Sequence, residues 1–130
     1  MNAVRHRARA LGILAVALAA AACSKGAATN CPGVIYVSVL ADGSVRVNGG
    51  PVALDDLANA LAQQKRNAKV VFYYREAGAG EPNGAQAKAV ATAMTSIMSL
   101  GMPVSLSSKP DFSDSIDADG RSRPRAGCPT

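Results

Sequence analysis

Hydrophobic and polar residues alternate along two short stretches of the chain that a turn separates. In "VIYVSVL" (34–40), Ile35, Val37 and Val39 share one face, and "VRVN" (45–48) alternates in the same way. Such alternation is typical of β-strands that bury one face. The intervening "ADGS" carries an Asp-Gly pair, which is a strong signal for a hairpin turn. The pattern therefore predicts a β-hairpin.

A helical pattern replaces this alternation after "GGP" (49–51), which we expect to interrupt the sheet. In "LDDLANALAQQ" (54–64), apolar residues recur at helical spacing. Asp55 and Asp56 fall in the first turn, where the helix dipole favours negative charge. Because adjacent helix residues do not face each other, these carboxylates stabilise the helix better than they would form a catalytic pair.

A second strand-helix-strand unit follows. The apolar run "KVVFYYR" (69–75) predicts an interior strand that is buried on both faces. A helix is predicted over "AQAKAVATAMTSIMSL" (85–100), with Asn83 and Gln86 as a capping box, and a last strand over "VSL" (104–106). The helix is expected to bury a stripe in which two methionines fill the core: Val90, Met94, Ile97 and Met98.

These elements predict an α+β domain with the order β-β-α-β-α-β. It would be a two-layer sandwich, in which two helices cover one face of a small mixed sheet and the last two strands are parallel. The segment 107–130 contains Pro, Ser, Asp and Arg but little periodicity. We therefore expect a folded domain over 34–106 and an irregular C-terminal tail over 107–130.

The N-terminus has the three-part layout of a secretory signal. Residues 1–9 are rich in arginine, residues 10–22 are apolar, and small residues lead to Cys23. The apolar run is shorter than the roughly 20 residues that span a bilayer, which makes a transmembrane helix the weaker interpretation. The cleavage site resembles a bacterial lipobox, whose cysteine is acylated and becomes the mature N-terminus. Ser24, rather than Asp, implies sorting to the outer membrane.

The resemblance implies a removed signal peptide over 1–22 and a lipidated Cys23 that starts a short tether over 23–33. The protein would then be exported to the periplasm and anchored to the outer membrane by lipid. Cys31 and Cys128 remain as a pair, and disulfides persist in exported proteins. We expect a bridge within the chain, while free thiols or a bridge between chains stay open as alternatives.

Composition excludes several classes of protein. Three of the fourteen Lys and Arg residues lie in the leader, which leaves eleven against nine Asp and Glu, so no strong basic patch for nucleic acid is expected. The absence of Trp argues against base-stacking surfaces. The single histidine, His6, also lies in the leader, so the mature chain lacks the residue that catalytic triads and common zinc sites need. We expect no cofactor and no metal.

Two stretches partly match ligand-binding loops. "GAGEPNG" (78–84) follows a strand and opens a helix, but its glycine spacing is wrong and Glu81 would repel phosphate. "SIDADG" (115–120) resembles the start of a calcium loop, but Ser115 and Ala126 stand where acidic ligands are required. We interpret both stretches as ordinary loops.

The order of the elements and their sequences resemble the periplasmic domain of the ExbD/TolR family. The matching stretches are "VSVLADGSVRVNGGPVALDDL" (37–57), "NAKVVFYYRE" (67–76) and "MTSIMSLGMPVSL" (94–106). Family members are subunits of proton-driven envelope motors, whose periplasmic domains dimerise and in some cases bind peptidoglycan. The apolar segment 10–22 has neither the Asp nor the length of the family's transmembrane helix, so the resemblance implies no proton-coupling role.

The sequence thus predicts a non-catalytic envelope lipoprotein whose ExbD/TolR-like domain binds a protein partner or peptidoglycan, with homodimer formation as an implied property. One alternative is a periplasmic accessory of a proton-driven transport complex. Another is a glycan hydrolase that would use carboxylates of the tail: Asp111, Asp114, Asp117 and Asp119. The expected partner-binding residues are charged groups at strand ends and in loops: Arg46, Arg75, Glu76 and Lys109.

Overall fold

The computed structural model describes residues 31–77 and 84–129. Five strands form one mixed sheet in the order β3-β2-β1-β4-β5, in which β1, β4 and β5 are parallel and β2 is antiparallel to both of its neighbours. Their bounds are β1 Val34–Val39, β2 Val45–Val47, β3 Gly50–Val52, β4 Val70–Arg75 and β5 Val104–Ser107. A separate antiparallel pair consists of β6 (Asp114–Ile116) and β7 (Ser122–Pro124).

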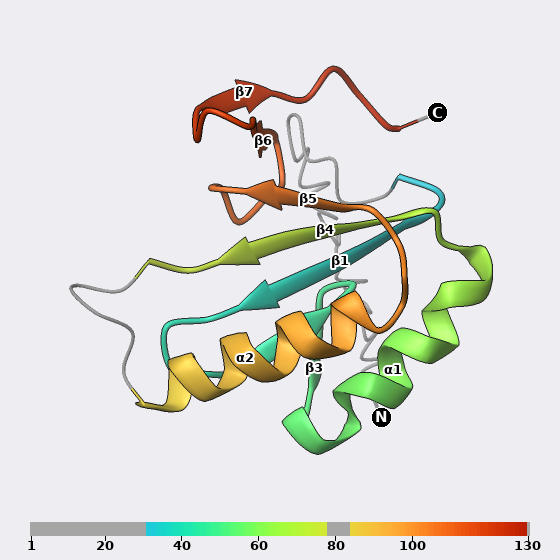
Figure 1. The fold of residues 1–130 in the computed structure, drawn as a ribbon, viewed down its shortest axis with the longest axis vertical. Helices are drawn as coiled ribbons and strands as arrows, with labels where there is room; N and C mark the ends of the chain where they lie inside the picture. The colour runs from blue at the N-terminus through green and yellow to red at the C-terminus, as the bar shows by residue number, and fades with distance from the viewer. Residues whose placement is uncertain (1–30, 78–83, 130) are drawn as a thin grey trace, which may run out of the picture.

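Two helices, α1 (Leu57–Gln64) and α2 (Gly84–Met98), pack on one face of the five-stranded sheet (Figure 1). Short 3₁₀ helices, η1 (Leu54–Asp56) and η2 (Lys65–Asn67), flank α1. The predicted α+β fold, with two helices against a mixed sheet, is therefore confirmed. The apolar run that forms β4 lies between β1 and β5, as an interior strand should.

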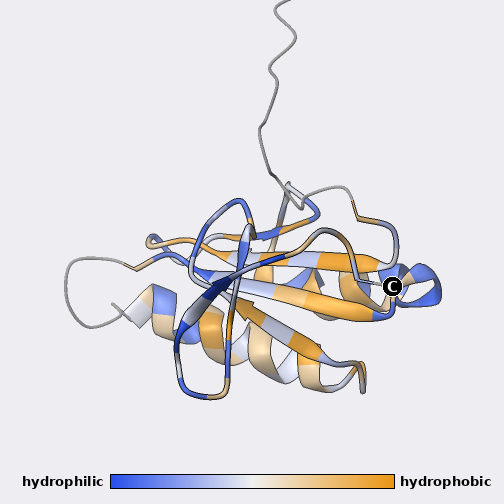
Figure 2. Cartoon of the chain, turned by 90° about the horizontal axis from the view of Figure 1, so that it is seen from above, coloured by the Kyte–Doolittle hydropathy of each residue, from blue (hydrophilic) through white to orange (hydrophobic). Residues whose placement is uncertain are grey.

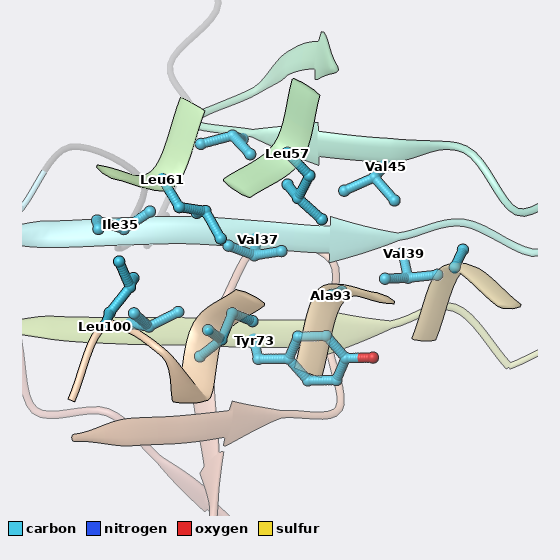
Figure 3. Packing of buried hydrophobic residues seen from close by; sticks show 13 residues of the cluster. Ile35, Val37, Val39, Val45, Leu57, Leu61, Tyr73, Ala93 and Leu100 are labelled. Atoms are coloured by element: carbon cyan, nitrogen blue, oxygen red, sulfur yellow. The ribbon is translucent and has the colours of Figure 1, made fainter. Parts of the chain in front are cut away.

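The main core lies between the sheet and the helices (Figure 3). Ile35, Val37 and Val39 are all buried there, which confirms the face predicted from their alternation. Leu57 and Leu61 of α1 are fully buried against the same strands. A fully buried leucine of this kind contributes about 1.5–3 kcal/mol through the hydrophobic effect.

The buried stripe of α2 differs from the prediction. Apart from Ile97, the buried residues are Gln86, Ala89 and Ala93. Of the other predicted residues, Val90 and Met94 are partly buried against the core, whereas Met98 is 72% exposed. Small alanines let the helix lie close to the sheet, so the larger residues one position further along move to its flank. Hydrophobic spacing alone favoured the larger residues and therefore placed the stripe about one residue too far along the chain.

The prediction that the sheet is interrupted at 49–51 is wrong, because a second hairpin turn connects β2 to β3. Asn48 and Gly49 have φ angles of 51° and 83°, and Val47 pairs with Gly50 on either side of them. Asn-Gly is the favoured pair for a two-residue turn that needs positive φ at both positions. Pro51 is tolerated because β3 is an edge strand.

The C-terminal tail is also more ordered than predicted, since it contains the β6–β7 hairpin and covers the sheet face opposite the helices. Figure 2 shows this mostly hydrophilic segment crossing the apolar strands. Its one large buried apolar residue, Phe112, packs with Tyr36, Phe72 and Tyr74 of the sheet. The tail therefore has too few apolar residues to show periodicity, but enough to complete a second core.

Gly43 in the β1–β2 turn offers a direct test of how tightly this turn packs on α2. Its φ is +86°, and a Cβ at this position would lie 2.8 Å from the backbone of Ala85. We expect Gly43→Ala to lower the free energy of unfolding by about 2–3 kcal/mol, from backbone strain together with the clash. Gly101→Ala is the control, because φ is +66° there but the space is open. It should cost only about 1 kcal/mol in the same urea titration; equal costs would show that the clash contributes nothing.

Candidate ligand-binding pocket

The described residues contain no helix that is long and apolar enough to cross a membrane and no group of three His, Cys, Asp or Glu residues suited to a metal ion. The predicted lipidation site, Cys23, and the signal segment lie outside those residues, as does Asn83 of the predicted capping box. Gln86, the predicted partner of Asn83, donates from Nε2 to the Glu76 carbonyl oxygen at 2.7 Å.

The predicted bridge within the chain is confirmed, because the Sγ atoms of Cys31 and Cys128 lie 2.01 Å apart. Cys31 is buried in the second core and its N–H donates to the hydroxyl oxygen of Tyr36 at 3.1 Å. The disulfide therefore ties the end of the tail to the start of β1, beside the aromatic residues that the tail covers.

The structure separates the four predicted partner-binding residues. Arg46 pairs with Ser38 on the sheet face opposite the helices, whereas Arg75 pairs with Val39, whose side chain faces the helices. Both arginines are exposed, and so is Lys109 in the loop after β5. Because Arg46 and Arg75 lie on opposite faces of the sheet, these two arginines form no shared binding surface.

Glu76, the fourth predicted partner-binding residue, has a structural contact. Its Oε2 accepts a hydrogen bond from the Ala41 N–H at 2.8 Å, and its side chain is half-buried. This contact fastens the β1–β2 turn to the end of β4. We therefore assign Glu76 to the fold rather than to a binding surface.

Asp114, one of the tail carboxylates considered for glycan hydrolysis, is only 1% exposed. Its oxygens accept hydrogen bonds from the hydroxyl groups of Ser107, Ser108 and Ser122 and from the Ser108 N–H. Burial by itself raises the pKa of Asp114, but these donors together hold the pKa far below its ordinary value. The carboxylate is therefore a structural acceptor that joins β5, β6 and β7.

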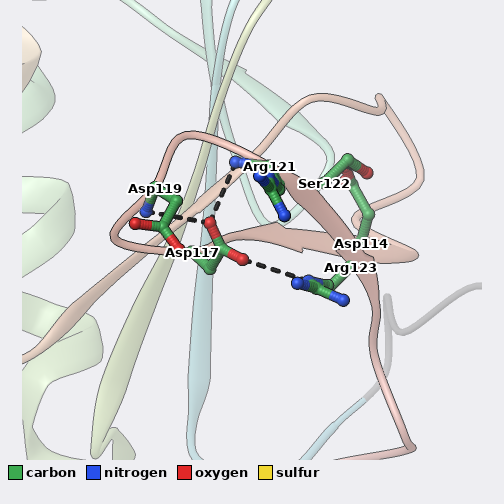
Figure 4. Close-up of polar contacts among 6 residues, drawn as sticks. All are labelled: Asp114, Asp117, Asp119, Arg121, Ser122 and Arg123. Carbon is green, nitrogen blue, oxygen red and sulfur yellow. Dashed lines mark hydrogen bonds and ion pairs between the residues drawn. The ribbon is translucent and has the colours of Figure 1, made fainter.

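Asp117 holds the turn between β6 and β7 (Figure 4). Its Oδ1 accepts the N–H groups of Asp119 and Arg121, and its Oδ2 accepts from Arg123 Nε at 3.0 Å. These contacts, the Arg121 N–H first, lower the pKa of Asp117, and hydrogen bonds from Ser113 lower the pKa of Asp111. A glycan hydrolase needs one carboxyl group with a raised pKa, and these three aspartates are shifted in the opposite direction.

A pocket of about 270 Å³ opens on the sheet face opposite the helices, between the β1–β2 hairpin and the start of the tail. We call it the Arg46 pocket. Its floor consists of Tyr36 and Phe112, which are 6% and 4% exposed, and its rim includes exposed residues of both segments. The lining residues are Tyr36, Ser38, Arg46, Asn48, Gly49, Pro110 and Phe112.

The register of β1 and β2 places the polar lining. Ser38 lies directly opposite Arg46, while Asn48 donates its N–H to the Tyr36 carbonyl and accepts the Tyr36 N–H on Oδ1 at 3.0 Å. Successive residues of a strand point to opposite faces, so Tyr36, Ser38 and Arg46 share the face away from the helices. The Asn-Gly turn thus fixes one wall of the pocket.

The tail holds the opposite wall. Phe112 has a φ of 57°, a conformation that is strained for a bulky residue, and its carbonyl oxygen accepts from Arg125 Nε at 3.0 Å. Arg125 also donates from a terminal nitrogen to Ser105 Oγ at 2.9 Å, and its guanidinium lies 3.6 Å from the centre of the Phe72 ring. Strain that is held by several contacts is typical of binding sites, which supports a functional role for this pocket.

Another hollow, of about 520 Å³, lies along α1, but all four lining residues are exposed side chains of that helix region: Asn59, Ala62, Gln63 and Arg66. A surface without a buried floor excludes little water from a ligand. The Arg46 pocket is smaller, yet it combines a buried aromatic floor with a cation at its rim. It is therefore the better candidate site.

The sequence analysis named one residue of this pocket, Arg46. It also named Lys109, which directly precedes the lining residue Pro110 in the chain. It missed Ser38, Asn48 and Phe112. The Asn-Gly pair was a usable signal, because it predicts a turn and therefore fixes which side chains of β1 and β2 are neighbours. Phe112 gave no such signal, since its position depends on how the tail folds back.

No protein-family model matches this chain, and no curated protein matches it.

Proposed function

We propose that this chain is an exported, lipid-anchored envelope protein that binds a component of the envelope through the Arg46 pocket and catalyses no reaction. The observation that carries the proposal is the pocket itself, with its buried aromatic floor and its exposed arginine. The resemblance of 34–106 to ExbD/TolR periplasmic domains and the lipobox-like segment support the placement in the periplasm at the outer membrane. An envelope protein and peptidoglycan are the two candidate partners.

The carboxylate arrangement of the tail supports a binding role over hydrolysis. The pKa values of Asp111, Asp114 and Asp117 are all lowered by hydrogen bonds, so none of these groups is prepared to donate a proton near neutral pH. Homodimer formation, which the resemblance implies, stays a prediction beside this binding role.

The test is crosslinking in cells, followed by recovery of the protein and its adducts and by co-sedimentation with purified peptidoglycan. We expect Arg46→Gln to lose the adduct or the sedimentation that the unchanged protein shows. A cation on the rim of a partly buried site typically contributes more than a solvated charge. The matched control is Arg75→Gln, because Arg75 is also exposed but lies on the other face of the sheet. Retained binding in Arg46→Gln would contradict the proposal.

A further inference from the structure

The polar groups of the Arg46 pocket are hydrogen-bond donors. Oδ1 of Asn48 already accepts the Tyr36 N–H, which leaves the Nδ2 amide group of its side chain, and this group can only donate. Arg46 adds a guanidinium with several donors, and Ser38 adds a hydroxyl group. The Arg46 and Asn48 groups only donate and the Ser38 hydroxyl can donate as well, so a ligand that satisfies all three presents acceptor atoms.

The pocket also has a net positive charge. No Asp or Glu belongs to its lining, and the one ion pair among the described residues, Arg123 with Asp117, lies elsewhere. The acid that Arg46 influences is Asp42, whose Oδ1 is occupied by the hydroxyl and N–H groups of Ser44. The pKa of Asp42 is lowered first by the Ser44 hydroxyl and only last by Arg46. Arg46 is therefore available to an anionic ligand.

The shape of the pocket limits that ligand to a small group with an apolar part. Its volume, about 270 Å³, lies below the range of about 300–1,000 Å³ that is usual for sites of drug-sized molecules. The rings of Tyr36 and Phe112 are 5.0 Å apart between centroids and provide an apolar floor. Because the rim is exposed at Arg46, Asn48 and Pro110, a longer chain can continue from the bound group into solvent.

We propose that the Arg46 pocket binds the free carboxylate at the end of a peptide whose terminal side chain is small and apolar. The guanidinium of Arg46 would pair with the carboxylate, in the bidentate geometry that arginine favours, and Asn48 and Ser38 would donate to its oxygens. The terminal methyl group would contact the ring of Phe112. This inference rests on the proposed function, since it names the ligand of the same pocket.

Calorimetric titration of the purified protein, with its disulfide intact, tests the inference. The probe is acetyl-alanyl-alanine with a free carboxylate, and the control ligand is the same dipeptide with a terminal amide. We expect saturable binding of the acid and at least about tenfold weaker binding of the amide, since the charged acceptor is lost. Equal binding of acid and amide would overturn the inference.

Two variants and a competitor sharpen the result. Arg46→Gln should weaken binding of the acid by about tenfold or more, while Arg75→Gln should leave it unchanged. Inorganic phosphate should compete poorly, because it lacks an apolar part for the aromatic floor; complete displacement by equimolar phosphate would show a general anion site and overturn the proposal. Titration of the L,L and D,D dipeptides then separates the two sources of such ends, ribosomal C-termini and wall peptides that end in D-alanine.

The calorimetric and cellular experiments fail independently. Loss of the cellular adducts in Arg46→Gln without binding of the dipeptide would leave the proposed function standing and reject the carboxylate as its ligand. Binding of the dipeptide with adducts that persist in Arg46→Gln would support the carboxylate site and reject its role in holding the partner.

Discussion

Loss of the disulfide between Cys31 and Cys128 is expected to lower the free energy of unfolding by about 4–5 kcal/mol. The bridge closes a loop with a sequence separation of 97 residues, which is nearly the whole folded part of the chain. In the chain-entropy model, a crosslink of this length removes many conformations from the unfolded chain. Because small domains are stable by only about 5–15 kcal/mol, the uncrosslinked protein should be marginally stable.

The measurement is urea unfolding of the oxidised protein against the Cys31→Ala/Cys128→Ser variant and against the unchanged sequence in dithiothreitol. The variant and the protein in dithiothreitol should have the same free energy of unfolding. Both should unfold with a larger m-value than the oxidised protein, because an uncrosslinked chain exposes more surface when it unfolds. Near-equal stability of the oxidised and reduced forms would show that the other contacts of the tail, such as those of Arg125, hold it without the bridge.

The parts of the fold that follow from local patterns could be predicted from the sequence. Alternation over 34–40 placed the buried face of β1 correctly, and the apolar run at 69–75 was correctly predicted as an interior strand. The stripe of α2 was predicted correctly at Ile97 and only in part elsewhere, because alanine buries well without standing out in a hydrophobic pattern. Ala89 and Ala93 are fully buried, while Met98 is exposed.

The candidate site depends on contacts between distant segments, which the sequence does not display. Phe112 reaches the pocket because Arg125 holds its carbonyl oxygen and because the tail crosses the sheet. Neither residue belongs to a periodic pattern, so the tail looked irregular. Arg46 was proposed only as one exposed charge among four, and the register with Ser38 is what distinguishes it from Arg75.

Asp114→Ala is expected to lower the free energy of unfolding by about 3–4 kcal/mol, since it removes a buried acceptor from several donors at once. Asp114 is only 1% exposed. Its removal would therefore take a hydrogen-bond acceptor away from three donors in a buried place: the hydroxyl groups of Ser107 and Ser122 and the N–H of Ser108. The matched control is Asp117→Ala, whose main ion pair with Arg123 is largely exposed. That change should destabilise the protein much less than Asp114→Ala in the same thermal and urea titrations.

The pH dependence of stability tests whether the charge of Asp114 is the stabilising feature. Its pKa is lower in the folded protein than the value of about 3.9 in unfolded chains, so the unfolded state binds more protons at low pH and stability rises with pH in that window. The stabilisation is fully present above about pH 4 and is lost as the pH falls through the folded-state pKa. The stability difference between the unchanged protein and Asp114→Asn should therefore shrink as the pH is lowered from 5 to about 2. A difference that stays constant over this range would show that shape, rather than charge, holds the tail. In that case, the hydrogen bonds that Ser107, Ser108 and Ser122 donate would stabilise the tail without need of a charged acceptor.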